Sequence, residues 1–308
     1  MALDFSTNSQ PAFFPWKGQF CPDLVNALLS RYPPGPSAVL LDPFCGSGTT
    51  LVCGLKAGFN VVGVDVNPAA YTIAKSLCAL TTMDPGQRLR SEELNLLSSL
   101  LKTAKKPAAL RRTLDLPYVT ERHVQVHLQS AAVLPCDSET VDLILTSPPY
   151  INVINYHQQF RKEMENMGYD VLKAARGEIG SNRSNRANRF RTIIDYCRSM
   201  NAILSELGRV LKADGRVVMV VGRSSKVNGV TVHNSSLVKD LMEQFFNVVT
   251  EERKYQNRYG DIIYEDVLIG LRKIEPTPID LRAYLCEYLA RLTQENPDKK
   301  IAIMAALP

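Results

Sequence analysis

A rigid polar corner follows one apolar strand of the sequence. Residues 141–145 have the apolar run of a buried strand, and the chain continues as Ser-Pro-Pro-Tyr at 147–150. Each proline ring fixes its own φ, and Pro149 also restricts Pro148 to an extended conformation. The direction of the Pro148 carbonyl is therefore set, and this carbonyl and the Ser147 hydroxyl can converge as two acceptors on one amine.

Such a pair of acceptors suits the exocyclic amine of a nucleobase. That nitrogen is planar and a poor nucleophile, because its lone pair is delocalised into the ring. Two fixed acceptors on its N–H groups favour a pyramidal nitrogen with an available lone pair, and the Tyr150 ring can stack on the base. The alternative is a proline-terminated edge strand without a catalytic role.

A second motif, DPFCGSGTT at Asp42–Thr50, lies where an apolar strand turns into a helix. Gly46 and Gly48 allow the backbone to bend sharply and a ligand to approach it. Asp65 ends the next strand, where a carboxylate can accept hydrogen bonds from both hydroxyls of an adenosine ribose. A dinucleotide fold would place a third glycine at Leu51, which disfavours a nicotinamide-dependent oxidoreductase. A plain structural turn and a capping aspartate are the alternatives without a ligand.

The elements around these motifs alternate between strands and helices. The near-continuous apolar strands at 38–42 and 60–65 are typical of parallel strands covered on both faces. A further strand is predicted at 124–128, and strands at 246–255 and 262–273 predict a closing antiparallel hairpin. The sequence therefore predicts an α/β fold with a mostly parallel sheet.

The 308 residues are enough for one large domain with insertions. We predict a catalytic domain over residues 1–275, with a helical insertion at about 81–122 and a basic insertion at about 158–198, followed by a helical extension over residues 276–308. No run of about 18 apolar residues and no signal sequence is present, which predicts a cytoplasmic protein without a membrane span. Seven cysteines without a Cys-x-x-Cys pair and four scattered histidines predict neither a disulfide framework nor a metal site.

Taken together, these motifs resemble those of the S-adenosylmethionine-dependent DNA amino-methyltransferases, which modify cytosine N4 or adenine N6. Their cofactor motif resembles Asp42–Thr50, their ribose acid matches Asp65, and their catalytic tetrapeptide matches residues 147–150. The resemblance implies a Rossmann-like methyltransferase fold with a seven-stranded sheet and S-adenosyl-L-methionine as the cofactor. The catalytic residues that it implies are Ser147, Pro148, Pro149 and Tyr150. The cofactor-binding residues that it implies are Lys17, Phe20, Asp42, Phe44, Gly46, Gly48, Thr49, Thr50, Asp65 and Ser130.

The resemblance implies methyl transfer to a base flipped out of double-stranded DNA, without a metal. Serine rather than aspartate at position 147 resembles the cytosine-N4 enzymes, with adenine N6 as the alternative. A restriction–modification system with an independently acting cognate restriction endonuclease is the expected setting. We also consider an RNA amino-methyltransferase and, as a binding module, a non-catalytic DNA-binding subunit. In one departure from the family, Gln129 and Ser130 stand where an acid is usual, so that an amide or hydroxyl would contact the adenine edge.

A basic segment follows the catalytic motif. Its arginines suit guanine edges and phosphates, and its asparagines suit adenine edges. Their spacing of three predicts that they share one helical face. The alternatives are a solvated basic helix and arginines paired with the protein's own acids. The predicted DNA-binding residues are Arg176, Asn182, Arg183, Asn185, Arg186, Arg189, Arg191 and Arg258.

Overall fold

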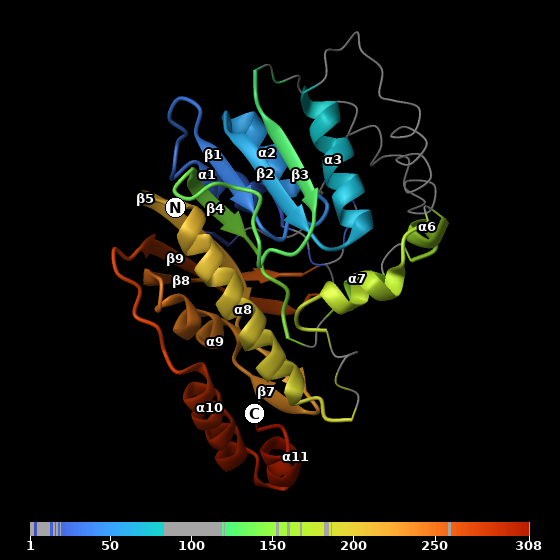
Figure 1. Cartoon of the computed structure of the whole chain (residues 1–308), viewed down its shortest axis with the longest axis vertical. Coiled ribbons are helices and arrows are strands. Elements are labelled where there is room, and N and C mark those ends of the chain that lie inside the picture. The colour runs from blue at the N-terminus through green and yellow to red at the C-terminus, as the bar shows by residue number, and fades with distance from the viewer. Residues whose placement is uncertain are drawn as a thin grey trace.

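The chain folds around one seven-stranded sheet with helices on both faces (Figure 1). The computed structural model describes residues 3–4, 13–14, 16, 18, 20–82, 119, 121–151, 154–158, 161–166, 168–181, 185, 187–257 and 260–307. In these ranges, no helix is both long enough and apolar enough to cross a bilayer.

The sheet has the strand order β3-β2-β1-β4-β5-β9-β8. Its first five strands pair in parallel, whereas β9 pairs antiparallel with both β5 and β8. The strands are β1 (Val39–Asp42), β2 (Asn60–Asp65), β3 (Val124–Leu128), β4 (Val141–Thr146), β5 (Leu211–Gly222), β8 (Phe246–Gln256) and β9 (Ile262–Arg272). The predicted fold class, a mostly parallel seven-stranded sheet closed by an antiparallel hairpin, is confirmed.

Successive residues of the central strands point to opposite faces of the sheet, so each face has its own apolar cluster. Leu41, Ile144 and Met219 pack on one side with α8, α9 and α10, and Figure 1 shows α8 lying across this face. Leu40 and Leu143 pack on the other side with α1 and α2. The helices around the sheet are α1 (Pro22–Leu29), α2 (Thr49–Ala57), α3 (Pro68–Thr82), α8 (Arg191–Val210), α9 (Asn234–Met242) and α10 (Leu281–Glu295).

Two local features differ from the expectation. The strand β5 starts at Leu211, directly after α8, and the pairing with β4 shifts from Val141↔Leu211 to Leu143↔Arg216. Asp214-Gly215, a dipeptide typical of turns, thus lies in a bulge within β5. A short hairpin of β6 (Ser225–Val227) and β7 (Val230–Val232) was also not predicted from the sequence. Its tip, Asn228-Gly229, has positive φ at both residues, as the Asn-Gly pair favours in two-residue hairpins.

The segment after β4 contains η1 (Tyr156–Gln158), α6 (Arg161–Asn166) and α7 (Val171–Gly177). The predicted insertion at 158–198 overlaps α8, because α8 begins at Arg191 and buries its apolar side against the sheet. The chain ends with η2 (Pro297–Lys299) and α11 (Lys300–Met304). Most of the predicted helical insertion at 81–122 lies outside the described residues. The boundary at residue 275 stays a prediction, and α10 beyond it packs into the core through Leu285 and Leu289.

Candidate active site

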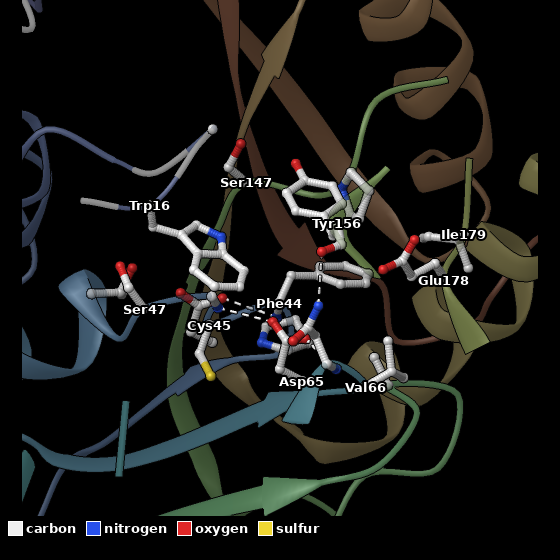
Figure 2. Close-up of a pocket in the computed structure, with 18 of the residues that line it drawn as sticks. Trp16, Phe44, Cys45, Ser47, Asp65, Val66, Ser147, Tyr156, Glu178 and Ile179 are labelled. Atoms are coloured by element: carbon white, nitrogen blue, oxygen red, sulfur yellow. Dashed lines mark hydrogen bonds between the residues drawn. The ribbon is translucent and has the colours of Figure 1, made fainter. Parts of the chain in front are cut away.

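One cavity opens at the carboxyl ends of β1, β2 and β4, and Figure 2 shows residues that line it. It contains about 860 Å³ of space free of atoms, including space open to solvent. The strands β1 and β4 are neighbours from which the chain winds in opposite directions, and open α/β sheets bind ligands at such a switch point. The position and size of the cavity suit a nucleotide-sized ligand.

The glycine turn between β1 and α2 forms the floor of the cavity. Gly46 and Gly48 both have positive φ, at 49° and 84°. A Cβ at Gly48 would lie 2.9 Å from the Ala74 Cα, so α3 can pack closely only on a glycine. A Cβ at Gly46 would lie 3.3 Å from the Trp16 indole nitrogen. Gly46 lines the cavity, whereas Gly48 fixes the turn and its contact with α3.

Asp65, at the end of β2, forms hydrogen bonds that stabilise this turn. Its Oδ2 accepts a hydrogen bond from Gly46 N at 2.9 Å, and its Oδ1 accepts one from Asn67 N at 2.8 Å. Burial raises the pKa of Asp65 from 3.8 to about 6, and these two backbone hydrogen bonds oppose the rise. Each carboxylate oxygen has a further lone pair, and the side chain borders the cavity. Asp65 can therefore accept hydrogen bonds from ligand hydroxyls.

Asp42 joins the glycine turn to the strand that precedes the catalytic motif. The Thr146 hydroxyl donates to Asp42 Oδ1 at 2.6 Å, and Phe44 N donates to the same oxygen at 3.1 Å. The Asp42 residue is only 2% exposed, and this burial raises its pKa to about 6. Because Thr146 directly precedes Ser147, this contact holds the start of the predicted catalytic motif next to the glycine turn.

The four residues of the predicted catalytic motif have different positions. Ser147 and Pro149 line the cavity, in which Gly46 and Asp65 also lie. Pro148 is buried. The half-buried Tyr150 lies outside the described lining, with its ring against Gly222, where a Cβ would be 2.9 Å from the Tyr150 Cε2.

The predicted cofactor residues are mostly brought together. The described ones that line the cavity are Phe20, Asp42, Phe44, Gly46, Thr49, Thr50, Asp65 and Ser130. Ser130 is exposed at the rim, where its hydroxyl accepts a hydrogen bond from Ala132 N at 3.2 Å. Lys17 lies outside the described residues.

Several residues of the cavity were not predicted from the sequence. Trp16 is 6% exposed and covers Gly46, and Asn67 is buried and donates from Nδ2 to the Tyr156 carbonyl at 3.1 Å. Tyr156 and Glu178 border the cavity from the segment after β4. Trp16 directly precedes Lys17, which the resemblance places at the cofactor, and this position was an available signal. No sequence signal indicated Glu178, which stood as the lone acid of a basic segment.

The Glu178 side chain is 4% exposed and contacts the fully buried His157 side chain, with Oε2 at 2.7 Å from Nδ1. This contact joins the end of α7 to η1. Ser181 donates to Asn155 Oδ1 at 3.2 Å, and Gly180 lies against the Tyr150 carbonyl. The segment 177–181 is therefore attached along the chain that follows the catalytic motif, and the two together form one wall of the cavity.

The predicted DNA-binding residues have mixed outcomes. Arg176, Arg189 and Arg191 are exposed, and Arg176 lies 4.0 Å from Asp170 in a loose ion pair. Asn185 donates to Asp195 Oδ2 at 2.8 Å, so its amide has an internal partner. Asn182, Arg183, Arg186 and Arg258 lie outside the described residues.

The expected common helical face is wrong for the residues of this segment that are described. Residues 185 and 187–190 form turns and bends rather than a helix. The neighbouring Asn188 accepts from Phe190 N at 3.1 Å and donates to the Ala302 carbonyl of α11 at 2.9 Å. Asparagine favours such local side-chain hydrogen bonds over helix, and here they arrange the chain before α8.

The cavity fits S-adenosylmethionine by the chemistry of its lining. The Trp16 and Phe44 rings offer apolar surface, Asp65 offers acceptors for ribose hydroxyls, and the backbone of the glycine turn allows close approach. The Thr49 hydroxyl is buried at this turn without a hydrogen-bond partner among the described residues. A polar ligand group at the turn would supply that partner.

The strand order, with its last antiparallel strand inserted between β5 and β8, defines a Rossmann-like methyltransferase fold. Residues 8–76 match a family model described as DNA methylase. The chain is 43% identical over 61 residues to the Type II methyltransferase M.MjaII of Methanocaldococcus jannaschii, a match that covers 20% of this chain and 11% of the relative. The segment matched by the family model contains the glycine turn and Asp65, so this part of the chain is similar to DNA methylases, and the match indicates S-adenosylmethionine as the cofactor.

A second relative is a tRNA (guanine(10)-N2)-dimethyltransferase of Methanocaldococcus jannaschii, 27% identical over 133 residues, or 43% of this chain and 29% of the relative. The chain thus spans less than a third of either curated relative. Among solved structures, a SAM-dependent methyltransferase from Methanosarcina mazei has a TM-score of 0.44 at 13% identity, over 80% of this chain and 98% of that chain. TrmN from Thermus thermophilus has a TM-score of 0.41 at 18% identity, over 83% of this chain and 50% of that chain.

Proposed function

We propose that the chain is a site-specific DNA methyltransferase that transfers a methyl group from S-adenosylmethionine to the N4 amine of a flipped-out cytosine. The observation that supports this most strongly is the shared cavity of Gly46, Asp65 and Ser147. A cofactor site and an amine site must adjoin for direct transfer, because methyl donor and acceptor have to be held in line and in contact.

On the cofactor side, Asp65 would hold the ribose hydroxyls and the glycine turn would receive the amino-acid part. Bound S-adenosylmethionine supplies an electrophilic methyl group on its sulfonium. Trp16 and Phe44 would shield that part of the cavity from water, which strengthens the polar contacts inside. Asp42 fixes the distance between the two half-sites, since it contacts both the turn and Thr146.

On the base side, the Ser147 hydroxyl and the Pro148 carbonyl would accept the two N–H groups of the target amine. This arrangement directs the nitrogen lone pair away from both acceptors, toward the methyl group. The amine is itself the nucleophile: its nitrogen would bond to the methyl carbon as the carbon–sulfur bond breaks, leaving a neutral thioether, and the nitrogen would then release one proton to solvent. The main task of the chain is to position the amine. Serine at 147 supports cytosine over adenine through the family resemblance, and adenine N6 is the alternative within the same site.

A base inside a duplex must leave the stack before its amine can reach Ser147. Arg176 would contact the DNA backbone near the cavity, since it is exposed and directly precedes Gly177 and Glu178 of the lining. Arg189 and Arg191 would extend this contact. The proposed setting is a restriction–modification system with an independent nuclease, which the relative named as a Type II methyltransferase supports.

RNA is the second candidate substrate. The match to a tRNA guanine-N2 methyltransferase favours it, because guanine N2 is also an exocyclic amine of a base. The same two acceptors at 147 and 148 would serve that chemistry. The DNA methylase match over residues 8–76 favours DNA.

Transfer of labelled methyl groups from S-adenosylmethionine to separate DNA and RNA substrates tests the proposal. We expect label in DNA with the wild-type protein and labelling about 100-fold slower with Ser147→Ala. Label in RNA alone would transfer the proposal to the second candidate. Label in neither polymer, although the protein binds the cofactor, would refute the enzymatic function and leave a DNA-binding subunit.

A further inference from the structure

A buried ion pair lies beside the tyrosine of the catalytic motif. Arg253 of β8 and Glu265 of β9 are register partners in the terminal hairpin, with Arg253 Nε 3.1 Å from Glu265 Oε2. Their side chains are only 3% and 12% exposed. Burying two charges is expensive, and an apolar pair of similar volume is often at least as stable. Stability alone therefore does not explain why this buried ion pair is present.

Glu265 contacts Tyr150 directly. The Tyr150 hydroxyl donates to Glu265 Oε1 at 3.3 Å, and it also lies 3.5 Å from the Ser147 hydroxyl. Glu265 pairs in register with Gly222 of β5, and the missing side chain of Gly222 makes room for the Tyr150 ring. The three strands β5, β9 and β8 thus present one row, Gly222, Glu265 and Arg253, under the catalytic motif.

The direction of these hydrogen bonds matters for the chemistry. Burial, and then the Glu265 carboxylate, raise the pKa of the Tyr150 phenol well above its ordinary value, so the hydroxyl keeps its single proton. Burial raises the pKa of Glu265, while Arg253 at 3.1 Å and the Tyr150 hydroxyl both oppose that rise and favour the ionised form. An ionised carboxylate can only accept, so it takes the proton of the Tyr150 hydroxyl in its hydrogen bond. The Tyr150 oxygen is then left as an acceptor for Ser147.

We propose that the Arg253–Glu265 pair orients a hydrogen-bond chain from Ser147 through Tyr150 to Glu265, so that the Ser147 oxygen faces the target amine with its lone pairs. The Ser147 proton points toward Tyr150 in this chain, away from the amine. The pair acts through Tyr150, so both members are positioning residues. This inference rests on the proposed function, because it gives Ser147 its acceptor role.

The first test replaces the pair without leaving a buried charge. The double variant Arg253→Met with Glu265→Leu keeps an apolar fill in the sheet and removes the acceptor for Tyr150. We expect about a 100-fold loss in the single-turnover rate of methyl transfer, the size of effect that a misplaced reacting group produces. The affinity for S-adenosylmethionine, measured by titration of the Trp16 fluorescence, should stay within about twofold of wild type, because the pair does not line the cofactor cavity.

The second test uses Tyr150→Phe, which keeps the ring and removes only the hydroxyl. It should lose about as much rate as the double variant, and the combined triple variant should lose no more than either one, because both changes break the same chain. The matched control is Arg31→Met with Glu251→Leu. That change removes an ion pair of 2.8 Å between Arg31, which follows α1, and Glu251 of β8, two residues from Arg253.

The outcomes separate this inference from the proposed function. If Ser147→Ala leaves transfer unchanged, the proposed function fails. If Ser147→Ala slows transfer about 100-fold but Tyr150→Phe keeps the wild-type rate, only the orienting chain is refuted. Multiplicative losses in the triple variant, or an equal loss in the Arg31 and Glu251 control, would also refute it. Should the double variant fail to fold, the Tyr150→Phe rate decides.

Discussion

Replacing Asp65 by asparagine should separate cofactor binding from folding. Asparagine has the same shape, but only one of its two terminal atoms is an acceptor, and the other faces a backbone N–H. The substitution therefore removes one hydrogen bond between a ribose hydroxyl and a charged carboxylate. Such a bond contributes about 2 kcal/mol to the binding free energy. The dissociation constant for S-adenosylmethionine should therefore rise by about 30-fold.

The same substitution should change the free energy of unfolding little, or increase it, although it weakens cofactor binding. The rise in the Asp65 pKa from 3.8 to about 6 means that keeping the buried carboxylate ionised at neutral pH costs about 3 kcal/mol. A neutral amide avoids that cost, while it loses one backbone hydrogen bond of about 2 kcal/mol. The free energy of unfolding at neutral pH should accordingly stay near the wild-type value or rise slightly.

Titration of the Trp16 fluorescence measures the affinity, because the chain has one tryptophan and this residue lines the cavity. Thermal unfolding measures the stability. The matched control is Asp142→Asn. Asp142 lies at the start of β4, at the end of the strand away from the cavity, and its carboxylate accepts from Val39 N at 2.8 Å and from Lys212 Nζ at 2.7 Å. The control should lower stability and leave affinity unchanged. An unchanged affinity in Asp65→Asn, or a loss of stability larger than that of the control, would refute this reasoning.

Further predictions concern pH, the base site and DNA. Burial raises the pKa values of Asp42 and Asp65 to about 6, so their contribution to the stability of the free protein is lost as pH rises from about 4 to about 6. Cofactor affinity should follow the opposite trend and weaken below about pH 6, which Trp16 fluorescence at several pH values checks; a flat affinity from about pH 7 to about pH 5 would contradict this. Ser147→Ala should lower the single-turnover rate by about 100-fold with little change in cofactor affinity, and a collapse of that affinity would show that the role is misassigned. Arg176→Ala should raise the KM for DNA and flatten its salt dependence while the rate at saturating DNA persists, and an unchanged KM would remove Arg176 from the DNA interface.

The local sequence pattern around the two motifs was sufficient to predict the central strands and the glycine turn. Buried parallel strands leave continuous apolar runs, and the backbone between them needs glycine at positive φ, so β1, β2 and the Gly46–Gly48 turn were accessible from the sequence. The antiparallel hairpin of β8 and β9 was accessible for a similar reason, since the short connection excludes a crossover.

Contacts between distant segments were not accessible in this way. In the sequence, Glu178 belongs to a basic segment that could be solvated. In the structure it contacts His157, 21 residues earlier in the chain, and lines the cavity. Asn188 looked like a reader of bases, but it forms hydrogen bonds with Phe190 and α11. The Arg253–Glu265 pair depends on strand register, which fixes which residues face each other.

Nucleoside analysis by mass spectrometry of DNA incubated with the protein and S-adenosylmethionine tests the central proposal most directly. The proposal predicts N4-methylcytosine in DNA treated with the wild-type protein, and its formation about 100-fold more slowly with Ser147→Ala. N6-methyladenine without N4-methylcytosine would contradict the base assignment. Unmodified DNA, or 5-methylcytosine as the product, would contradict amine methylation at Ser147 altogether.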